Sequence, residues 1–428
     1  MKGNSNCGRD SNNPESESRR TGLMMDRTSS QRDEMMTEPT PEQIHWNQLR
    51  KQHLLDEKVS DCYEVAKAQL GLHSTDYWTP YFSVWARIGD FDARRMFESI
   101  NNGERLVRTH AFRTTLHVIH IDNLSMIISA TGPALYKVCR NDKFAKVDQL
   151  SDREIEHMLS HVREALQDGP LRTSALKRIV PDKAHVRSAL LMLMARGEVV
   201  RAKANHARSN LTSYALLDRW VSGFRLKVLD EQEATTKLIR GHIGRFGPVS
   251  VDDIAWWLNL TKAAVKRAVQ NLGDDITMIL HRERECYMRT SDHEIASAIE
   301  RPEKDIVWFL PYEDHFLKAF IDRTDFINED IQARLSPADR RHYWPSNPDA
   351  PRAMLSRTLA ATGEVRPSIW LNGRVVGRWE IDDLGEQKRI VTSLYTPDAR
   401  DHHEGVEQVR SELEDFVNQA LLPISTGR

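Results

Sequence analysis

Apolar residues recur at approximately helical spacing through the first folded part of the chain. They follow a helical period between Thr40 and Leu72, and 81–88 and 93–100 continue it as two shorter helices. The run 106–118 alternates between apolar and polar residues and predicts a strand with hairpin partners. Helices followed by a β-ribbon are the order of elements in a winged helix.

The next two segments of the chain repeat this order of elements. The first predicts helices over 151–167, 173–178 and 182–196 and strands over 198–202 and 213–217. The second predicts helices over 231–246, 251–258 and 262–272, the last N-capped by Thr261, and strands over 276–280 and 286–289. The repetition predicts tandem winged-helix modules.

The character of the chain changes after Pro302. Short β-type runs cover 306–310, 368–371 and 375–381, Asn372-Gly373 is a turn signal between two of them, and 404–422 has the pattern of a closing amphipathic helix. We therefore expect an α+β protein. The expected parts are a disordered tail over 1–38, winged helix 1 with the candidate active site over 39–148, winged helix 2 over 149–228, winged helix 3 over 229–300 and a β-rich C-terminal domain over 301–428.

Composition excludes several classes of protein. The 428 residues contain four scattered cysteines, without CxxC or a histidine at metal-ligand spacing, so neither a disulfide framework nor a metal site is expected. No apolar run approaches the roughly 20 residues that a membrane helix needs. The N-terminus has no signal-peptide core, and we expect a cytoplasmic protein.

Charge is unevenly distributed although the formal net charge is only −2. The stretch 171–210 carries a local excess of seven positive charges. Basic residues fall on the expected recognition helices and wing: Arg187, Arg201, Lys203, Arg208, Lys262, Lys266 and Arg267. Solvated helix faces are the plain alternative, but the coincidence with the DNA-contacting parts of two consecutive repeats favours double-stranded DNA as the partner.

Polar groups concentrate between Gly71 and His117. His73, Thr75 and Asp76 follow a predicted helix and are the candidate catalytic residues, while the expected strand carries three further polar candidates near phosphate, Arg108, Arg113 and His117. Alternation predicts that Arg113, Thr115 and His117 share one face of that strand. The plain interpretation is that Asp76 or a neighbour caps the next helix and that His73 is packed in the interior.

Several motifs resemble the AlkZ and YcaQ type winged-helix DNA glycosylases. The resemblance is carried by Leu70-Gly71-Leu72 with Asp76, Ser83-Val84-Trp85-Ala86-Arg87, Leu106-Val107-Arg108-Thr109, Arg113-Thr114-Thr115-Leu116-His117, Leu310-Pro311-Tyr312-Glu313-Asp314 with Asp322-Arg323, and Asn372-Gly373-Arg374-Val375-Val376-Gly377-Arg378-Trp379. It extends from about Glu42 to the C-terminus and implies three tandem winged helices around B-form DNA with a small C-terminal β-barrel.

The resemblance also implies a reaction. Characterised members hydrolyse the N-glycosidic bond of alkylated or crosslinked purines with a Gln-x-Gln or Gln-x-Asp motif, where this chain has His73-Ser74-Thr75. Thr114 also replaces the glycine of the family's usual Arg-Gly-Thr-Leu-His strand. A cationic purine needs little leaving-group assistance, so a neutral histidine that positions water and accepts a proton is a workable substitute for glutamine.

These observations favour a monofunctional DNA glycosylase for base excision or crosslink repair, without metal or organic cofactor. We expect it to be a monomer that associates with the nucleoid when bound to DNA. The alternative is a non-catalytic winged-helix DNA binder, a regulator or damage sensor, in which the replaced glutamines mean lost chemistry. A third alternative is a protein-interaction module that uses winged helices without DNA.

Overall fold

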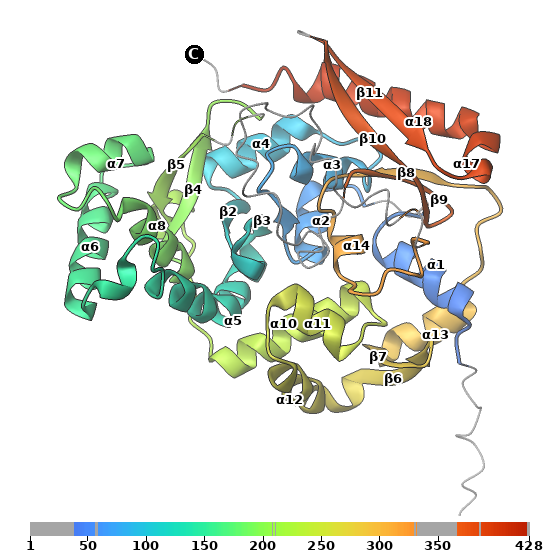
Figure 1. Cartoon of the computed structure of the whole chain (residues 1–428), viewed down its shortest axis with the longest axis horizontal. Helices are drawn as coiled ribbons and strands as arrows, with labels where there is room; N and C mark the ends of the chain where they lie inside the picture. Colours follow the sequence, from blue (N-terminus) through green and yellow to red (C-terminus); the bar gives the residue numbers. More distant parts are fainter. Residues whose placement is uncertain are drawn as a thin grey trace, which may run out of the picture. The chain divides into compact units, whose positions relative to one another are not determined.

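The computed structural model describes residues 38–55, 59–207, 209, 211–328, 331, 366–384 and 387–425. Helices and antiparallel sheets are mixed along these residues, as the α+β prediction requires (Figure 1). The expected disordered tail and Arg208 lie outside the described residues.

The chain enters the fold through four helices, α1 (Pro41–Lys51), α2 (Cys62–Ala68), α3 (Thr79–Trp85) and α4 (Ala93–Asn102). Thr40 starts α1 with a capping box, in which its side chain accepts from the Gln43 backbone and the Gln43 side chain accepts from Thr40. The short strand β1 (Leu72–His73) follows α2.

The alternating run is a hairpin and not one strand. β2 (Leu106–His110) and β3 (Leu116–His120) pair in register around the turn 111–115, which contains the 3₁₀ turn η1 (Phe112–Thr114). Arg113 has φ of +52° inside this turn. The prediction that Arg113, Thr115 and His117 share a strand face is therefore wrong, because the backbone turns over between them.

Helix α5 (Ile121–Arg140) was not predicted from the sequence. Pro133 lies inside it, and a proline in a helix interior normally argues against a helix. Gly132 allows α5 to approach α8 (Val186–Ala195), since a Cβ there would lie 2.2 Å from the backbone oxygen of Ala195. Tertiary packing thus outweighs the local signal.

The middle segment of the chain has the predicted order of three helices and a hairpin. After η2 (Val147–Gln149) its elements are α6 (Asp152–Ala165), α7 (Thr173–Ile179), α8, β4 (Val199–Ala204), β5 (Thr212–Leu216) and the short α9 (Leu217–Trp220). Ser151 and Glu154 form a capping box at the start of α6.

The first two hairpins join into one five-stranded antiparallel sheet in the order β1-β3-β2-β4-β5. The junction is a single register pair between β2 and β4, in which Arg108 lies opposite Arg201. Strands assigned by the sequence to two separate modules therefore share one hydrogen-bonded sheet.

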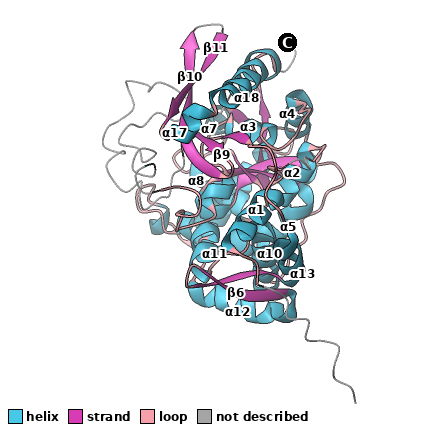
Figure 2. Ribbon diagram, turned by 90° about the vertical axis from the view of Figure 1, so that its right-hand side faces the viewer, coloured by secondary structure: helices cyan, strands magenta, loops and turns pink. Residues whose placement is uncertain are grey.

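The third segment repeats the order with a sheet of its own. Its elements are α10 (Glu231–Phe246), α11 (Val251–Leu258), α12 (Lys262–Leu272), η3 (Gly273–Asp275), β6 (Ile276–His281), β7 (Arg284–Arg289) and α13 (Thr290–Ala298). Thr261 caps α12 as predicted, accepting from the Ala264 backbone. β6 and β7 form a two-stranded sheet beside α12 and α13 (Figure 2).

The C-terminal region contains a four-stranded antiparallel sheet in the order β11-β10-β9-β8. Its elements are β8 (Val307–Leu310), α14 (His315–Lys318), β9 (Ser368–Leu371), β10 (Arg374–Leu384), β11 (Gln387–Leu394), α17 (Pro397–Asp401), α18 (His403–Asp415) and a terminal π-helical turn η5 (Phe416–Leu421). Asn372 and Gly373 both have positive φ in the predicted turn between β9 and β10. In the described strands, β11 and β8 are the two edges and do not pair.

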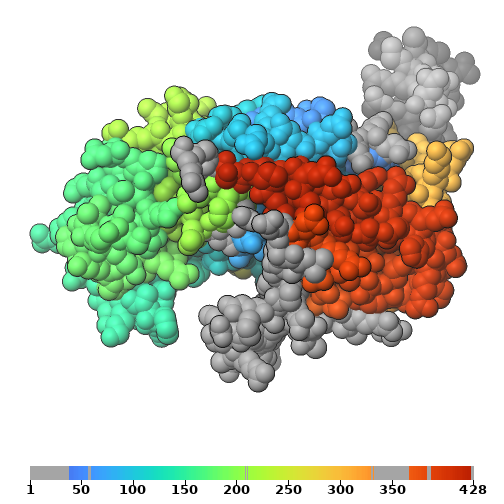
Figure 3. Space-filling model, turned by 90° about the horizontal axis from the view of Figure 1, so that it is seen from above, coloured from blue at the N-terminus to red at the C-terminus, as the bar shows by residue number. Residues whose placement is uncertain are grey.

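The hydrophobic cores connect regions that are far apart in the sequence. One cluster packs Phe82 and Phe97 of the N-terminal helices with Trp379 and Leu413 of the C-terminal region. Figure 3 shows the C-terminal segment lying along the helices near residue 100. The C-terminal region thus completes the core beneath β1 and β3.

Helices long and apolar enough to span a membrane are absent from the described residues. In the same part of the chain, no group of three or more His, Cys, Asp or Glu side chains is arranged to hold a metal ion.

Candidate active site

His73 and His117 face each other at the edge of the five-stranded sheet. They are register partners on β1 and β3, and their rings meet edge to face with centroids 5.6 Å apart. Only 4% of His73 and 2% of His117 is exposed. The backbone N–H of Ser74 donates to Leu116 at 2.8 Å and fixes the chain just beyond His73. Two residues predicted for the site are therefore in contact.

A carboxylate from the C-terminal region completes this group. Glu313 Oε2 lies 3.8 Å from His73 Nε2, and the Lys318 ammonium also pairs with Glu313. Glu313 is 2% exposed and has φ of +58°, a conformation uncommon for a residue with a side chain. Tyr312, which precedes it, presents its ring to His73 with centroids 6.2 Å apart. The sequence motif around Glu313 was recognised, but nothing in it marked this glutamate as a partner of His73.

A buried ion pair anchors the segment that carries Glu313. Arg87 donates to both carboxylate oxygens of Asp314 at 2.8 Å, and the Ser83 hydroxyl donates to Asp314 at 3.1 Å. Burial alone would raise the pKa of the Asp314 carboxyl, but the Arg87 guanidinium outweighs it and holds that pKa below its ordinary value. The pair fixes the position of Glu313 from the residue next to it.

The other histidines of the site are held neutral. Burial, with the neighbouring His315 as the second cause, lowers the pKa of His117 well below its ordinary value. Burial also lowers the pKa of His315 to about 4. His117 is thus a neutral hydrogen-bonding group at physiological pH, with its Nδ1 3.1 Å from the Thr115 carbonyl oxygen.

Thr75 and Asp76 lie differently from His73. Thr75 is exposed, whereas Asp76 is mostly buried and accepts from the Trp78 backbone N–H at 2.8 Å. Burial raises the pKa of Asp76 to about 6. This contact holds the backbone just before α3, whose N-cap is Trp78 without a side-chain cap, so the plain interpretation that Asp76 caps the helix is wrong.

The turn 111–115 after β2 is held by contacts of its side chains and backbone. Arg113 stacks its guanidinium over the Trp256 ring of α11 at 3.8 Å. Thr114 has φ of +61°, which explains why glycine suits this position; a β-branched residue there costs on the order of 1 kcal/mol. His110 Nδ1 contacts the Thr114 carbonyl oxygen at 2.7 Å and braces the turn.

The predicted DNA-contacting residues divide by exposure. Exposed members are Arg187, Lys203, Lys262, Lys266 and Arg267, while Arg201 and Arg113 are partly buried and Arg108 is buried. Lys262 is paired with Asp252 at 2.8 Å. Arg208 lies outside the described residues, so its place relative to the others is a prediction from sequence alone.

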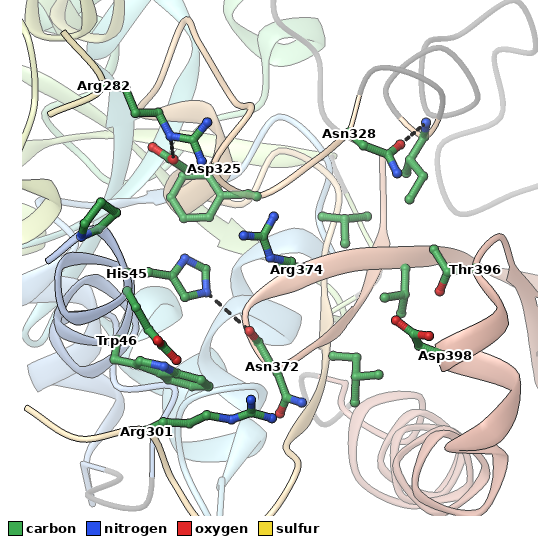
Figure 4. Close-up of a pocket in the computed structure, with 17 residues that line it drawn as sticks. His45, Trp46, Arg282, Arg301, Asp325, Asn328, Asn372, Arg374, Thr396 and Asp398 are labelled. Atoms are coloured by element: carbon green, nitrogen blue, oxygen red, sulfur yellow. Dashed lines mark hydrogen bonds and ion pairs between the residues drawn. The ribbon is translucent and has the colours of Figure 1, made fainter. Parts of the chain in front are cut away.

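A pocket of about 630 Å³ lies away from these residues, between α1 and the turn joining β9 and β10 (Figure 4). His45 Nε2 contacts the Asn372 carbonyl oxygen at 3.2 Å, and Arg282 pairs with Asp325. Arg301 pairs with Asp305 at 3.2 Å. These two arginines are neutralised by carboxylates of the chain itself.

The sequence profile of the AlkZ-like DNA glycosylases matches residues 67–417. The chain belongs to this family. An interstrand DNA cross-link repair glycosylase from Streptomyces sahachiroi is 22% identical over 303 residues, which are 67% of this chain and 72% of the relative. The solved structure of the Streptomyces sahachiroi DNA glycosylase AlkZ superposes with a TM-score of 0.68 at 18% identity, covering 91% of this chain and 98% of that one.

Family membership confirms the resemblance inferred from the motifs, and the structural match supports the mixed α and β fold. The assignment of His73 and Thr75 to the two signature positions of the family stays a prediction from the sequence.

Proposed function

We propose that this protein is a monofunctional DNA glycosylase that hydrolyses the N-glycosidic bond of alkylated or bulky-adduct purines. We further propose that residues 39–148, 149–228 and 229–300 are three winged-helix modules that hold the duplex. The observation that carries the proposal is the buried His73–Glu313 pair, with Nε2 and Oε2 3.8 Å apart. A carboxylate at this distance stabilises the imidazolium that forms when a histidine accepts a proton.

The proposed reaction needs one water molecule. Its oxygen attacks C1′ of the sugar, the bond from C1′ to the purine nitrogen breaks, and the departing electron pair neutralises the positive charge of the alkylated base. His73 Nε2 takes the proton of the water, and Glu313 stabilises the resulting charge. We assign water positioning to the hydroxyl of the exposed Thr75, and Asp76 is a positioning residue that fixes the chain beyond Thr75 through its contact with Trp78.

The test uses duplex DNA containing 7-methylguanine, with release of the base as the measurement. We expect His73→Ala to lower the single-turnover rate by 10²- to 10⁴-fold, the usual contribution of a general base, while DNA affinity is retained. His157→Ala, which removes an exposed histidine from α6, is the matched control. Unchanged release by His73→Ala would refute this catalytic assignment.

Glu313→Gln gives a second readout, which a purely structural role would not move. Removing the carboxylate takes away the charge that stabilises the imidazolium formed when His73 accepts a proton, so the maximal rate should fall by about tenfold and the rise of activity with pH should move to lower pH. Glu313→Gln/Lys318→Met also removes the ammonium that pairs with Glu313 and is used if the single variant fails to fold.

The non-catalytic DNA binder is the second candidate. It is favoured by the 4% exposure of His73 together with the replacement of both signature side chains. Tight duplex binding that weakens as salt rises, without base release from 7-methylguanine, bulky N7 adducts or a nitrogen-mustard crosslink, would support it. Failure to bind duplex DNA at low salt would favour the protein-interaction module instead.

A further inference from the structure

A second pocket lies on the sheet where β2 joins β4. This seam pocket has a volume of about 520 Å³, within the range of small-molecule sites. Its polar lining includes His110 and Thr114 at the turn after β2, Arg187 on α8 and Arg201 on β4. Because Thr114 belongs to the turn that leads into β3, the pocket lies close in the chain to the His117 strand.

Arg187 and Arg201 of the seam pocket form no ion pair with a carboxylate in the part of the chain that the structure describes. The buried Nε of Arg201 also has no hydrogen-bond partner there. Asp142, which lines the pocket, accepts instead from the Ala145 backbone N–H at 3.0 Å. With Lys143, the lining carries three cationic side chains against the one carboxylate of Asp142, so it presents a net positive field to a ligand.

A third arginine, Arg108, lies next to Arg201 on the sheet. Arg108 is the register partner of Arg201, so both side chains lie on the same face of the sheet. Arg108 is 4% exposed, and no hydrogen bond or ion pair to its guanidinium is found among the described residues. Two like charges placed directly opposite each other destabilise a sheet unless an anion compensates them.

Part of the lining of the seam pocket is apolar. Val138 of α5 is 56% exposed, and Leu191 and Met194 of α8 line the same space. Tyr214 on β5 also lines the pocket, with the Arg201 guanidinium 5.7 Å from its ring centroid. A phosphate group alone would not use this apolar lining, whereas a nucleotide has both an anionic group and an apolar aromatic face.

We propose that the seam pocket binds one extrahelical nucleotide of DNA, with its phosphate on Arg187 and Arg201 and its base against Val138, Leu191 and Tyr214. This assignment rests on the proposed DNA-binding function. A base taken out of the duplex loses its stacking neighbours, and contact with apolar and aromatic side chains replaces them. Figure 4 shows an arginine that differs from those of the seam pocket: Arg282, in the pocket near α1, forms an ion pair with Asp325.

The experiment compares three probes by fluorescence anisotropy and competition: a fully paired duplex, the same duplex with a one-nucleotide bulge, and free thymidine 5′-monophosphate. None contains an alkylated base, so the result does not depend on glycosylase activity. We expect the wild-type protein to bind the bulged duplex at least tenfold more tightly than the paired duplex.

Two variants test the apolar lining and the cationic lining of the pocket separately. Leu191→Trp fills the space beside the apolar lining and should abolish the preference for the bulge while paired-duplex affinity stays within twofold of wild type. Arg187→Ala should weaken binding of the bulged duplex and lower its salt slope by about one unit. Arg178→Ala, an exposed arginine on α7 outside the pocket, is the matched control and should leave the preference intact.

The assignment is overturned if the wild-type protein shows no preference for the bulge, or if Leu191→Trp keeps the preference in full. Binding of free thymidine 5′-monophosphate without a bulge preference would also overturn it, because the pocket would then take a free nucleotide and not one in DNA. If the wild-type protein shows the bulge preference but releases no base from duplex DNA containing 7-methylguanine, only the proposed catalysis is refuted.

Discussion

The buried arginines Arg87 and Arg108 differ in the partners of their guanidinium groups. Arg87, fully buried on the carboxyl side of α3, donates to both oxygens of Asp314 and to the backbone oxygens of Ser83 and Gln52. Arg108, 4% exposed on β2, has another arginine as its register partner. Burial lowers the pKa of Arg108, and the charge of Arg201 acts in the same direction.

The difference separates a charge that is satisfied within the chain from one that is buried without a partner among the described residues. Arg87 is satisfied within the chain and holds the segment that carries Glu313. Arg108 keeps a charge that no described residue neutralises, and keeping such charge costs stability. Phosphate bound at the proposed seam pocket would offset part of that cost.

Breaking the satisfied pair should have the largest effect. Arg87→Ala leaves the Asp314 carboxylate buried without its cation, and we expect a loss of about 3–5 kcal/mol in the free energy of unfolding, measured by urea denaturation. Asp314→Ala should cost a similar amount, and the double variant should cost less than the sum of the two. Additive losses would show that the two side chains do not stabilise each other.

Asp76 tests a buried carboxyl whose contacts are backbone N–H groups. Its folded pKa of about 6 lies above the ordinary 3.8, so the folded state binds the proton more tightly, and this stabilisation, full below pH 3.8, is lost as pH rises through 6. Asp76→Asn keeps an acceptor for Trp78 but removes the titration. Between pH 4 and 7 the wild-type free energy of unfolding should fall by up to about 3 kcal/mol relative to the variant. Parallel pH profiles would contradict this.

Removing the unsatisfied arginine should have the smallest effect on stability, and with the opposite sign. Arg108→Met replaces a buried charge with an apolar side chain of similar length, and we expect the free protein to be equally stable or more stable by about 1 kcal/mol. Thermal unfolding in low-phosphate buffer is the measurement. A loss of several kcal/mol would show that Arg108 is satisfied within the fold, as Arg87 is.

The sequence predicted the elements with strong local signals. The helix bounds 231–246 and 251–258 and the Thr261 cap agree with the structure, because periodicity and capping are encoded within a few residues. Helix α5 was missed because Pro133 opposes it locally and packing on α8 compensates. The placement of Arg113 on a strand was wrong. The alternation of apolar and polar residues continues through a tight turn, and neither Arg113 nor Thr114 is a residue type that indicates the positive φ found there.

The candidate site likewise contains residues that could be predicted from the sequence and one that could not. His73 and His117 were chosen from adjacent stretches, and strand pairing brings them together. Glu313 is 240 positions from His73 in the sequence, and its contact depends on a turn fixed by Arg87 and Asp314. Such a contact has no local pattern. The sharing of one sheet by β2 and β4 likewise depends on tertiary packing.

The five-stranded sheet also fixes the distance between Arg201 and His73. Neighbouring strands lie about 4.8 Å apart, so the three steps from β4 through β2 and β3 to β1 set the backbones of Arg201 and His73 about 14 Å apart. At 3.4 Å per base pair this is the rise of about four base pairs of B-form DNA. Hydrogen bonds between strands maintain this distance, so the spacing between the proposed nucleotide site and the proposed catalytic histidine is a fixed property of the backbone.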